Sequence, residues 1–95
     1  MASYELMLLL RSNQEDSARE SLLKKTEETI NSSKGKITSL KPLGKKELVY
    51  PIKKQKEAYF YLFELEGPGN LIQALNKKIK LQDGILRHLV VRKEE

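Results

Sequence analysis

The sequence contains no cysteine and a single histidine, His88. Without cysteine the chain can form no disulfide bond and no thiolate metal site, and it has no thiol nucleophile. That absence fits a reducing compartment. Long apolar runs are also missing, since none approaches the roughly 20 residues that a helix needs to span a bilayer. A disulfide scaffold, a cysteine-ligated metal site and a helical membrane protein are therefore excluded.

What the chain does contain is charge. Its 95 residues are 39% hydrophobic and 33% charged, and the net charge is +5. The apolar content is enough for a folded core and the length allows only one, so we expect a single domain over residues 1–95. A basic chain favours an anionic partner such as RNA, DNA or an acidic membrane surface, although many small soluble proteins are basic without one.

Three apolar runs predict well-formed strands. Tyr4–Leu10 is short and continuous, which suits a central strand buried on both faces. Tyr59–Leu65 is rich in aromatic residues and is the strongest strand pattern in the chain. Ile85–Val91 follows the turn signal Asp83-Gly84 and predicts the last strand.

The segment 36–53 predicts an edge strand. Pro42 and Pro51 cannot donate hydrogen bonds to a neighbouring strand, so they are tolerated at an edge and unfavourable at the centre of a sheet. Leu48–Ile52 resumes the strand after a break at Gly44, which is typical of a bulge.

Helical periodicity marks residues 14–33. Asn13 is suited to the N-cap position, and Gly35 to a left-handed residue after the last turn. The predicted buried stripe is Ala18, Leu22, Leu23, Thr26 and Ile30.

A second helix is predicted after Gly67-Pro68-Gly69, with Pro68 at its first position. Its buried stripe is Leu71, Ile72, Leu75 and Ile79. The order is then strand, helix, strand, strand, helix, strand. Right-handed crossovers place both helices on one face of a four-stranded antiparallel sheet with strand order 4-1-3-2. This is an α+β, ferredoxin-like βαββαβ fold, and it puts the two most apolar strands at the centre.

The connection between the second and third strands is almost entirely basic. Residues 53–56 read Lys-Lys-Gln-Lys, and residues 45–56 contain five lysines against one glutamate. The turn signal is weak because the link has no Gly, Asn or Asp. A hairpin that concentrates positive charge in this way suits phosphate binding. The lysines concerned are Lys45, Lys46, Lys53, Lys54 and Lys56.

The side of the sheet away from the helices is predicted to be apolar. The residues expected there are Met7, Leu9, Phe60, Leu62, Leu89 and Val91. The buried set is then Leu6, Leu8, Leu10, Tyr59, Tyr61, Phe63, Leu86 and Val90. Alternation alone does not settle the third strand, because both of its faces are apolar. An uncovered apolar patch usually marks a binding surface, and the alternative is a mildly apolar sheet in contact with solvent.

Catalysis finds little support. A lone histidine within a strand, such as His88, is more often structural than catalytic, and no cluster has metal-ligand spacing. Gly67-Pro68-Gly69 lacks the context of a phosphate-binding loop, and Pro68 removes one amide donor. Residues 11–14 are not the glycine-rich loop of the acylphosphatases, which share this fold. We expect no enzymatic activity and no cofactor.

RNA-recognition motifs also share this topology. The closest register of their third-strand pattern is residues 56–63, where the lysine and two aromatic positions match. The glycine, the first aromatic residue and the small residue do not. Base stacking on this strand is therefore weakly supported.

A more specific pattern lies in residues 43–61. The segment L-G-K-K-E-L-V-Y-P-I-K-K, followed by A-Y-F-Y, resembles the signature of the bacterial small-subunit ribosomal protein S-six family. That family typically reads L-G-x-R-x-L-A-Y-P-I-x-K and then G-Y-F. The matching residues are Leu43, Gly44, Leu48, Tyr50, Pro51, Ile52, Lys54, Tyr59 and Phe60.

The resemblance spans essentially the whole chain. Tyr4-Glu5 is similar to the family's opening, and Val90-Val91-Arg92 to its closing strand. The chain departs from the pattern at Ala2-Ser3, where arginines are common, and at Ala58, where glycine is usual.

The resemblance implies a ferredoxin-like, non-enzymatic component of the small ribosomal subunit in the cytoplasm. The family binds the central domain of small-subunit (16S) ribosomal RNA jointly with ribosomal protein eighteen, and no membrane or small-molecule substrate is implied. The lysine-rich hairpin would face phosphates, and the apolar sheet face would meet the protein partner. The alternative is a stand-alone RNA-binding or ligand-binding regulatory module of the same fold. The candidate RNA-binding residues are Lys45, Lys46, Lys53, Lys54, Lys56, Arg87, Arg92 and Lys93.

Overall fold

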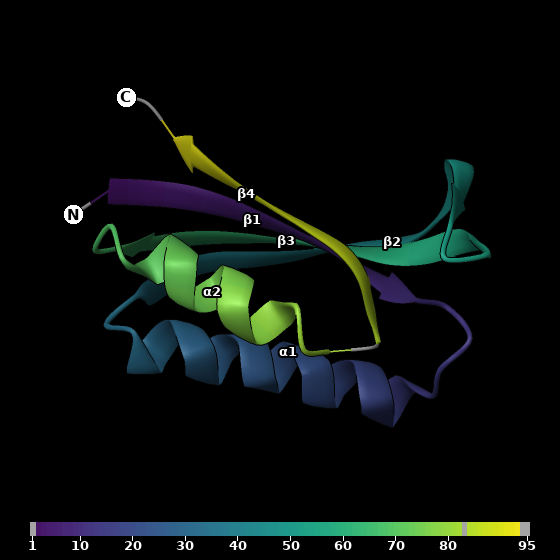
Figure 1. The fold of residues 1–95 in the computed structure, drawn as a ribbon, viewed down its shortest axis with the longest axis horizontal. Helices are drawn as coiled ribbons and strands as arrows, with labels where there is room; N and C mark the ends of the chain where they lie inside the picture. The colour runs from purple at the N-terminus through teal and green to yellow at the C-terminus, as the bar shows by residue number, and fades with distance from the viewer. Residues whose placement is uncertain (1, 83, 94–95) are drawn as a thin grey trace.

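The computed structural model describes residues 2–82 and 84–93 (Figure 1). Its elements are β1 (Ala2–Arg11), α1 (Asp16–Ser32), β2 (Lys36–Ile52), β3 (Gln55–Gly67), α2 (Leu71–Ile79) and β4 (Ile85–Lys93). The strands form one antiparallel sheet in the order β2-β3-β1-β4, and both helices lie on the same side of it (Figure 1). This is the predicted order read from the other edge, so the ferredoxin-like fold is confirmed.

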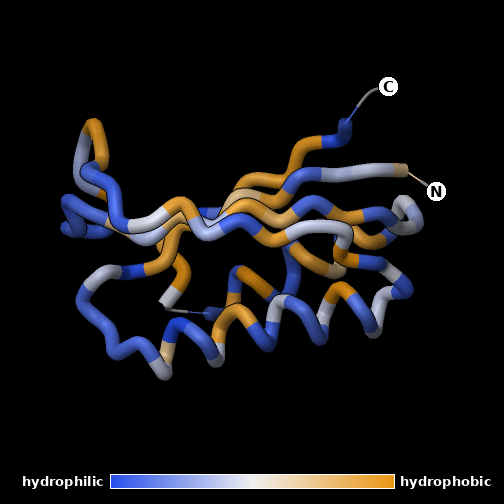
Figure 2. Tube along the Cα trace, turned by 180° about the vertical axis from the view of Figure 1, so that it is seen from behind, coloured by the Kyte–Doolittle hydropathy of each residue, from blue (hydrophilic) through white to orange (hydrophobic). Residues whose placement is uncertain are grey.

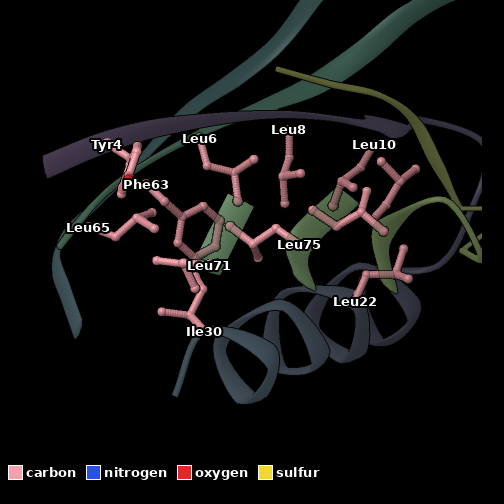
Figure 3. Close-up of a cluster of buried hydrophobic side chains, with 12 residues drawn as sticks. Tyr4, Leu6, Leu8, Leu10, Leu22, Ile30, Phe63, Leu65, Leu71 and Leu75 are labelled. Atoms are coloured by element: carbon pink, nitrogen blue, oxygen red, sulfur yellow. The ribbon is translucent and has the colours of Figure 1, made fainter. Parts of the chain in front are cut away.

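The core forms between the sheet and the two helices (Figure 3). Alternate residues of β1 are buried there, and Phe63 and Leu65 of β3 lie beside them. Burying each large apolar side chain contributes about 1.5–3 kcal/mol, which makes this layer the main source of stability. The predicted buried set is confirmed, with Tyr59, Tyr61 and Val90 only partly buried against the core.

The start of α1 differs from the prediction. Glu15, rather than Asn13, occupies the N-cap position, and no side chain caps the helix. The reason lies in Gln14, whose Nε2 donates to the carbonyl oxygens of Arg11 and Gly84 at 3.0 and 3.1 Å. These bonds hold the connection in a loop that ties the end of β1 to the start of β4. Asp83 of the predicted turn lies outside the described residues.

The buried stripe of α1 contains Arg19 where Ala18 was predicted. The Arg19 guanidinium lies 3.9 Å from the centroid of the Tyr59 ring, donates to the carbonyl oxygen of Gln14 at 2.8 Å, and pairs with Asp16. The aromatic ring stabilises the positive charge of the guanidinium, and the aliphatic part of the arginine side chain covers apolar surface. Leu22, Thr26 and Ile30 are buried as predicted, and Leu23 is partly buried.

The connection from α1 to β2 contains a left-handed residue, but it is Lys34, with φ 64°, and not Gly35. Gly35 is needed for close packing instead, because a Cβ there would lie 2.9 Å from Ile30 Cγ2 and 3.0 Å from Leu71 Cδ2. A Cβ on Gly67 would lie 2.6 Å from Leu71 Cδ2 and 3.2 Å from Gly35 Cα. The two glycines thus allow the strands to approach α2.

Helix α2 begins later than predicted. Asn70 is its N-cap residue, and Pro68 lies before it, where its carbonyl oxygen accepts a hydrogen bond from the Leu71 amide at 3.0 Å. The placement of Pro68 at the first helical position was therefore wrong. The predicted apolar stripe is confirmed, with Leu71, Leu75 and Ile79 buried and Ile72 partly buried.

Strand β2 is an edge strand, as predicted, and a register shift with φ 84° at Gly44 confirms the bulge there. A larger irregularity follows. Glu47 faces Glu57 and Ile52 faces Gln55, so residues 48–51 oppose Lys56 alone. Residues 48–52 thus belong to β2, as predicted, but most of them do not pair with β3. Because these extra residues have no partners in β3, the chain rises away from the sheet on the side opposite the helices (Figures 1 and 2). We call residues 48–51 the β2 bulge.

The β2–β3 turn is shorter than predicted, because β3 already begins at Gln55. Lys53 and Lys54 form it, with φ values of 49° and 67°. Two successive left-handed residues match the twist of a hairpin, and Asn-Gly is the preferred pair. For a residue with a Cβ and a long side chain, each such conformation costs on the order of 1 kcal/mol.

We therefore expect the double substitution Lys53→Asn and Lys54→Gly to stabilise the fold by about 1–2 kcal/mol, because the left-handed strain is relieved. The free energy of unfolding in urea measures this effect. The control is Lys53→Gln with Lys54→Gln, which removes the same two charges and keeps the strain. Equal unfolding free energies for the two double variants would contradict the assignment of strain to this turn.

Candidate functional site

The side of the sheet away from the helices carries the predicted apolar residues. Strand pairing sets Met7 between Leu62 and Leu89, and Leu9 beside Phe60. We call this surface the open face, and its apolar residues are Met7, Leu9, Phe60, Leu62, Leu89 and Val91. Leu89 and Val91 are 60% and 49% exposed, and the other four are half-buried. The alternation that was ambiguous in β3 is thus resolved, with Tyr59, Tyr61 and Phe63 turned to the core.

The lysines of the β2–β3 hairpin lie at one end of the sheet. All five are exposed, and we call Lys45, Lys46, Lys53, Lys54 and Lys56 the lysine hairpin. Lys45 Nζ lies 3.4 Å from a carboxylate oxygen of Glu57, and Lys46 Nζ lies 5.7 Å from the centroid of the Phe60 ring. Within the described part of the chain, Lys53, Lys54 and Lys56 form no ion pair. Their ammonium groups are therefore accessible to an anion in solution.

The basic residues of β4 divide between the two ends of the sheet. Arg87 pairs with Leu9 and is exposed, at the hairpin end of the sheet but on the edge opposite β2. Arg92 and Lys93 pair with Tyr4 and Ser3, at the opposite end. The structure thus brings the five hairpin lysines together, places Arg87 at the same end on the opposite edge of the sheet, and places Arg92 and Lys93 at the other end.

At that opposite end Lys93 belongs to a network of charges. Its Nζ lies 3.7 Å from Glu5 and 3.6 Å from Glu64, and Lys41 approaches Glu64 at 3.4 Å. The Lys41 hydrogen bond and charge, followed by the Lys93 charge, lower the pKa of Glu64. A hollow of about 570 Å³ lies here, lined by Ser3, Tyr4, Glu5, Thr38, Glu64, Leu65, Glu66 and Lys93.

Sequence reasoning missed this acidic end. The signal was present in the sequence, because Glu5 is two residues from Met7 and Glu64 is two residues from Leu62. A period of two therefore places both carboxylates on the open face. The apolar part of the open face therefore stops at Glu5 and Glu64, whose charges are balanced by Lys41 and Lys93.

The β2 bulge was also missed. Val49 is 97% exposed and Tyr50 is 66% exposed, so neither side chain contributes to the core. The only available signal was Pro51, because the apolar residues around it read as an ordinary strand.

His88 has a structural environment. Its Nε2 donates to Asn76 Oδ1 at 2.9 Å, and partial burial, followed by the Lys80 charge, lowers its pKa. Across residues 2–82 and 84–93, no three carboxylate or imidazole side chains lie close enough together to hold a metal ion. Neither described helix is long and apolar enough to cross a membrane.

Comparisons with known proteins agree along the whole chain. The family model of ribosomal protein S6 matches residues 3–92. Small ribosomal subunit protein bS6 of Heliobacterium modesticaldum is 35% identical over 95 residues, which are 100% of this chain and 99% of that protein. The protein of the same name from Thermoanaerobacter pseudethanolicus is 33% identical over 100% of both chains. The crystal structure of 30S ribosomal protein S6 from Thermotoga maritima is similar with a TM-score of 0.92 and 26% identity, over 97% of this chain and 87% of that one.

We expect the pKa of Glu64 in the folded protein, measured by NMR titration, to lie below the ordinary glutamate value. Lys41→Met should raise it, because Lys41 is the largest cause of the shift. Added salt should also raise it by screening. Since the folded pKa is below the unfolded one, the carboxylate favours folding above the unfolded pKa, and this contribution is lost as the pH falls through the folded pKa. Lys24→Met, on α1, is the control; an equal rise in that variant would refute the pairing.

Proposed function

Because this chain belongs to the ribosomal protein S6 family, we propose that it binds the central domain of small-subunit (16S) ribosomal RNA together with ribosomal protein eighteen. As a member of that family it is a non-enzymatic component of the bacterial small ribosomal subunit and acts in the cytoplasm. Within this proposal residues 1–95 act as one domain.

The observation that carries the proposal is the separation of two surfaces. The lysine hairpin presents positive charge at one end of the sheet, and the open face presents apolar side chains. The lysine hairpin suits RNA, because each lysine that neutralises a phosphate releases a counterion and so favours binding. The open face suits a protein, because burial of apolar surface drives protein association.

The charges of the chain support this assignment of partners. Lys41, Lys45 and Lys93 are balanced by carboxylates on neighbouring strands. Lys53, Lys54 and Lys56 form no ion pair within the described residues, so they add net positive charge at the hairpin end and guide RNA to it. At the other end of the open face, the charge network provides a polar rim for a protein partner.

Replacing Lys53, Lys54 and Lys56 with Ala should weaken RNA binding and reduce its dependence on salt. Loss of three phosphate contacts lowers the slope of log affinity against log salt concentration by about 2–3. The measurement is a filter-binding titration of a central-domain RNA fragment, with ribosomal protein eighteen present, over a range of KCl concentrations.

The matched control replaces Lys24, Lys25 and Lys77 with Ala, which removes the same charge from exposed positions on the helices. It should leave the salt slope close to that of the unmodified chain. An equal loss of slope in both triple variants would show that the binding follows total charge and not the hairpin.

Phe60→Asp should impair docking of ribosomal protein eighteen more than it impairs contact with RNA. The substitution places a carboxylate in the apolar part of the open face, where burial would remove its hydration. Calorimetric titration with ribosomal protein eighteen measures the first effect, and RNA binding in its absence measures the second. Leu81→Asp is the control, because Leu81 is 74% exposed and follows α2, away from this surface. RNA binding that is equal with and without ribosomal protein eighteen would contradict joint recognition.

A further inference from the structure

The β2 bulge exposes apolar side chains that the fold does not use. Val49 and Tyr50 are 97% and 66% exposed, and the bulge rises from the sheet edge (Figure 2). Scattered apolar side chains on a surface are ordinary. Here two are adjacent, on a segment that has left the strand ladder, and Pro51 restricts the backbone beside them. Their exposure adds nothing to the stability of the free chain.

The surroundings of the bulge are basic. Lys45 and Lys46 precede it and Lys53, Lys54 and Lys56 follow it, against two carboxylates, Glu47 and Glu57. An aromatic ring among lysines is the combination by which proteins bind single-stranded nucleic acid, since the ring stacks on a base while the lysines hold the flanking phosphates.

The two carboxylates refine the orientation of such a ligand. Glu47 and Glu57 face each other in the strand register, and both line a hollow of about 330 Å³ with Leu48, Val49, Pro51 and Lys56. Glu57 is paired with Lys45 at 3.4 Å, which leaves Glu47 and Lys56 to face a ligand in this hollow. The amino groups of a base can donate to a carboxylate oxygen, and a flanking phosphate can contact the lysine. We therefore expect the base of a nucleotide to lie at the β2 bulge and its phosphates to contact the lysines of the turn.

We propose that Tyr50 is a stacking site for an unpaired base of the ribosomal RNA, flanked by phosphates on the lysine hairpin. The proposal rests on the function proposed above and adds a recognition element to it. The lysines supply affinity for any polyanion, whereas the Tyr50 ring selects an unstacked base over a continuous duplex. A protein partner is less suited to the bulge, because the lysines around it would have to be paired or desolvated.

The test compares Tyr50→Leu with Tyr50→Phe in binding to the central-domain RNA fragment, with ribosomal protein eighteen present. Stacking is worth about 1–3 kcal/mol per base, so Tyr50→Leu should weaken binding by about 5- to 150-fold. Tyr50→Phe keeps the ring and should bind within about twofold of the unmodified chain. Neither changes the charge, so the salt slope should stay constant, unlike that of the lysine variants.

Leu81→Ser is the control, because it removes an exposed apolar side chain that follows α2, away from the hairpin. We expect it to bind RNA normally. Urea unfolding of Tyr50→Leu should match the unmodified chain within about 0.5 kcal/mol, as for other exposed positions.

Three results would overturn the inference. Normal RNA binding by Tyr50→Leu would show that no base stacks on this ring. Weaker binding of Tyr50→Leu to ribosomal protein eighteen alone, without RNA, would assign the bulge to the protein partner. Failure of the unmodified chain to bind the fragment with that partner present would instead refute the proposed function itself, and the stacking site with it.

Discussion

Burial of one side of the sheet under the two helices is the constraint on which the rest of the structure depends. Leu6, Leu8 and Phe63 are fully buried against Leu71 and Leu75. A shift of the pairing by one residue would turn every one of the strand side chains to solvent, so the core fixes the register of the central strands. The open face follows from the same requirement, because the alternate residues of those strands must point away from the helices. A surface with no role in the core is thus specified as strictly as the core itself.

The charges are ordered along the sheet in a way that the core does not require. At one end, Glu5 and Glu64 are matched by Lys41 and Lys93, and the network is close to neutral. At the other end, lysines without carboxylate partners extend beyond the apolar residues. Paired charges add little to the electrostatic potential beyond about a Debye length, whereas unpaired lysines attract an approaching polyanion. In the function proposed above, this polarity of the sheet orients the RNA and the protein partner with respect to each other.

The parts of this fold that the sequence predicted are those set by local periodicity. Strand alternation, helical spacing, the crossover rule and the prolines of β2 were sufficient for the strand order. They did not settle which side of β3 faces the helices, because both of its faces are apolar, and the pairing with β1 decides it. Three of the exceptions depend on contacts between distant segments. The Gln14 amide binds Gly84 and so displaces the start of α1 from Asn13, and Arg19 is buried because Tyr59 lies above it. The size of the β2 bulge depends on where Ile52 meets β3, which no local pattern in β2 encodes.

Departures from the local rules of folding gather in the β2–β3 hairpin. Gly44 carries a bulge, Lys53 and Lys54 carry left-handed backbone, and Val49 and Tyr50 leave the strand to stand in solvent. None of these features stabilises the isolated chain, and the turn strains it. Where local structure opposes stability in one segment, function is the expected compensation. The same segment contains the residues that match the family signature, from Gly44 to Tyr50 and Pro51 of the β2 bulge. Apart from Tyr59, which packs against the core, the residues of that signature lie outside the core cluster. The function proposed above, and not the stability of the core, is therefore the reason offered for this pattern.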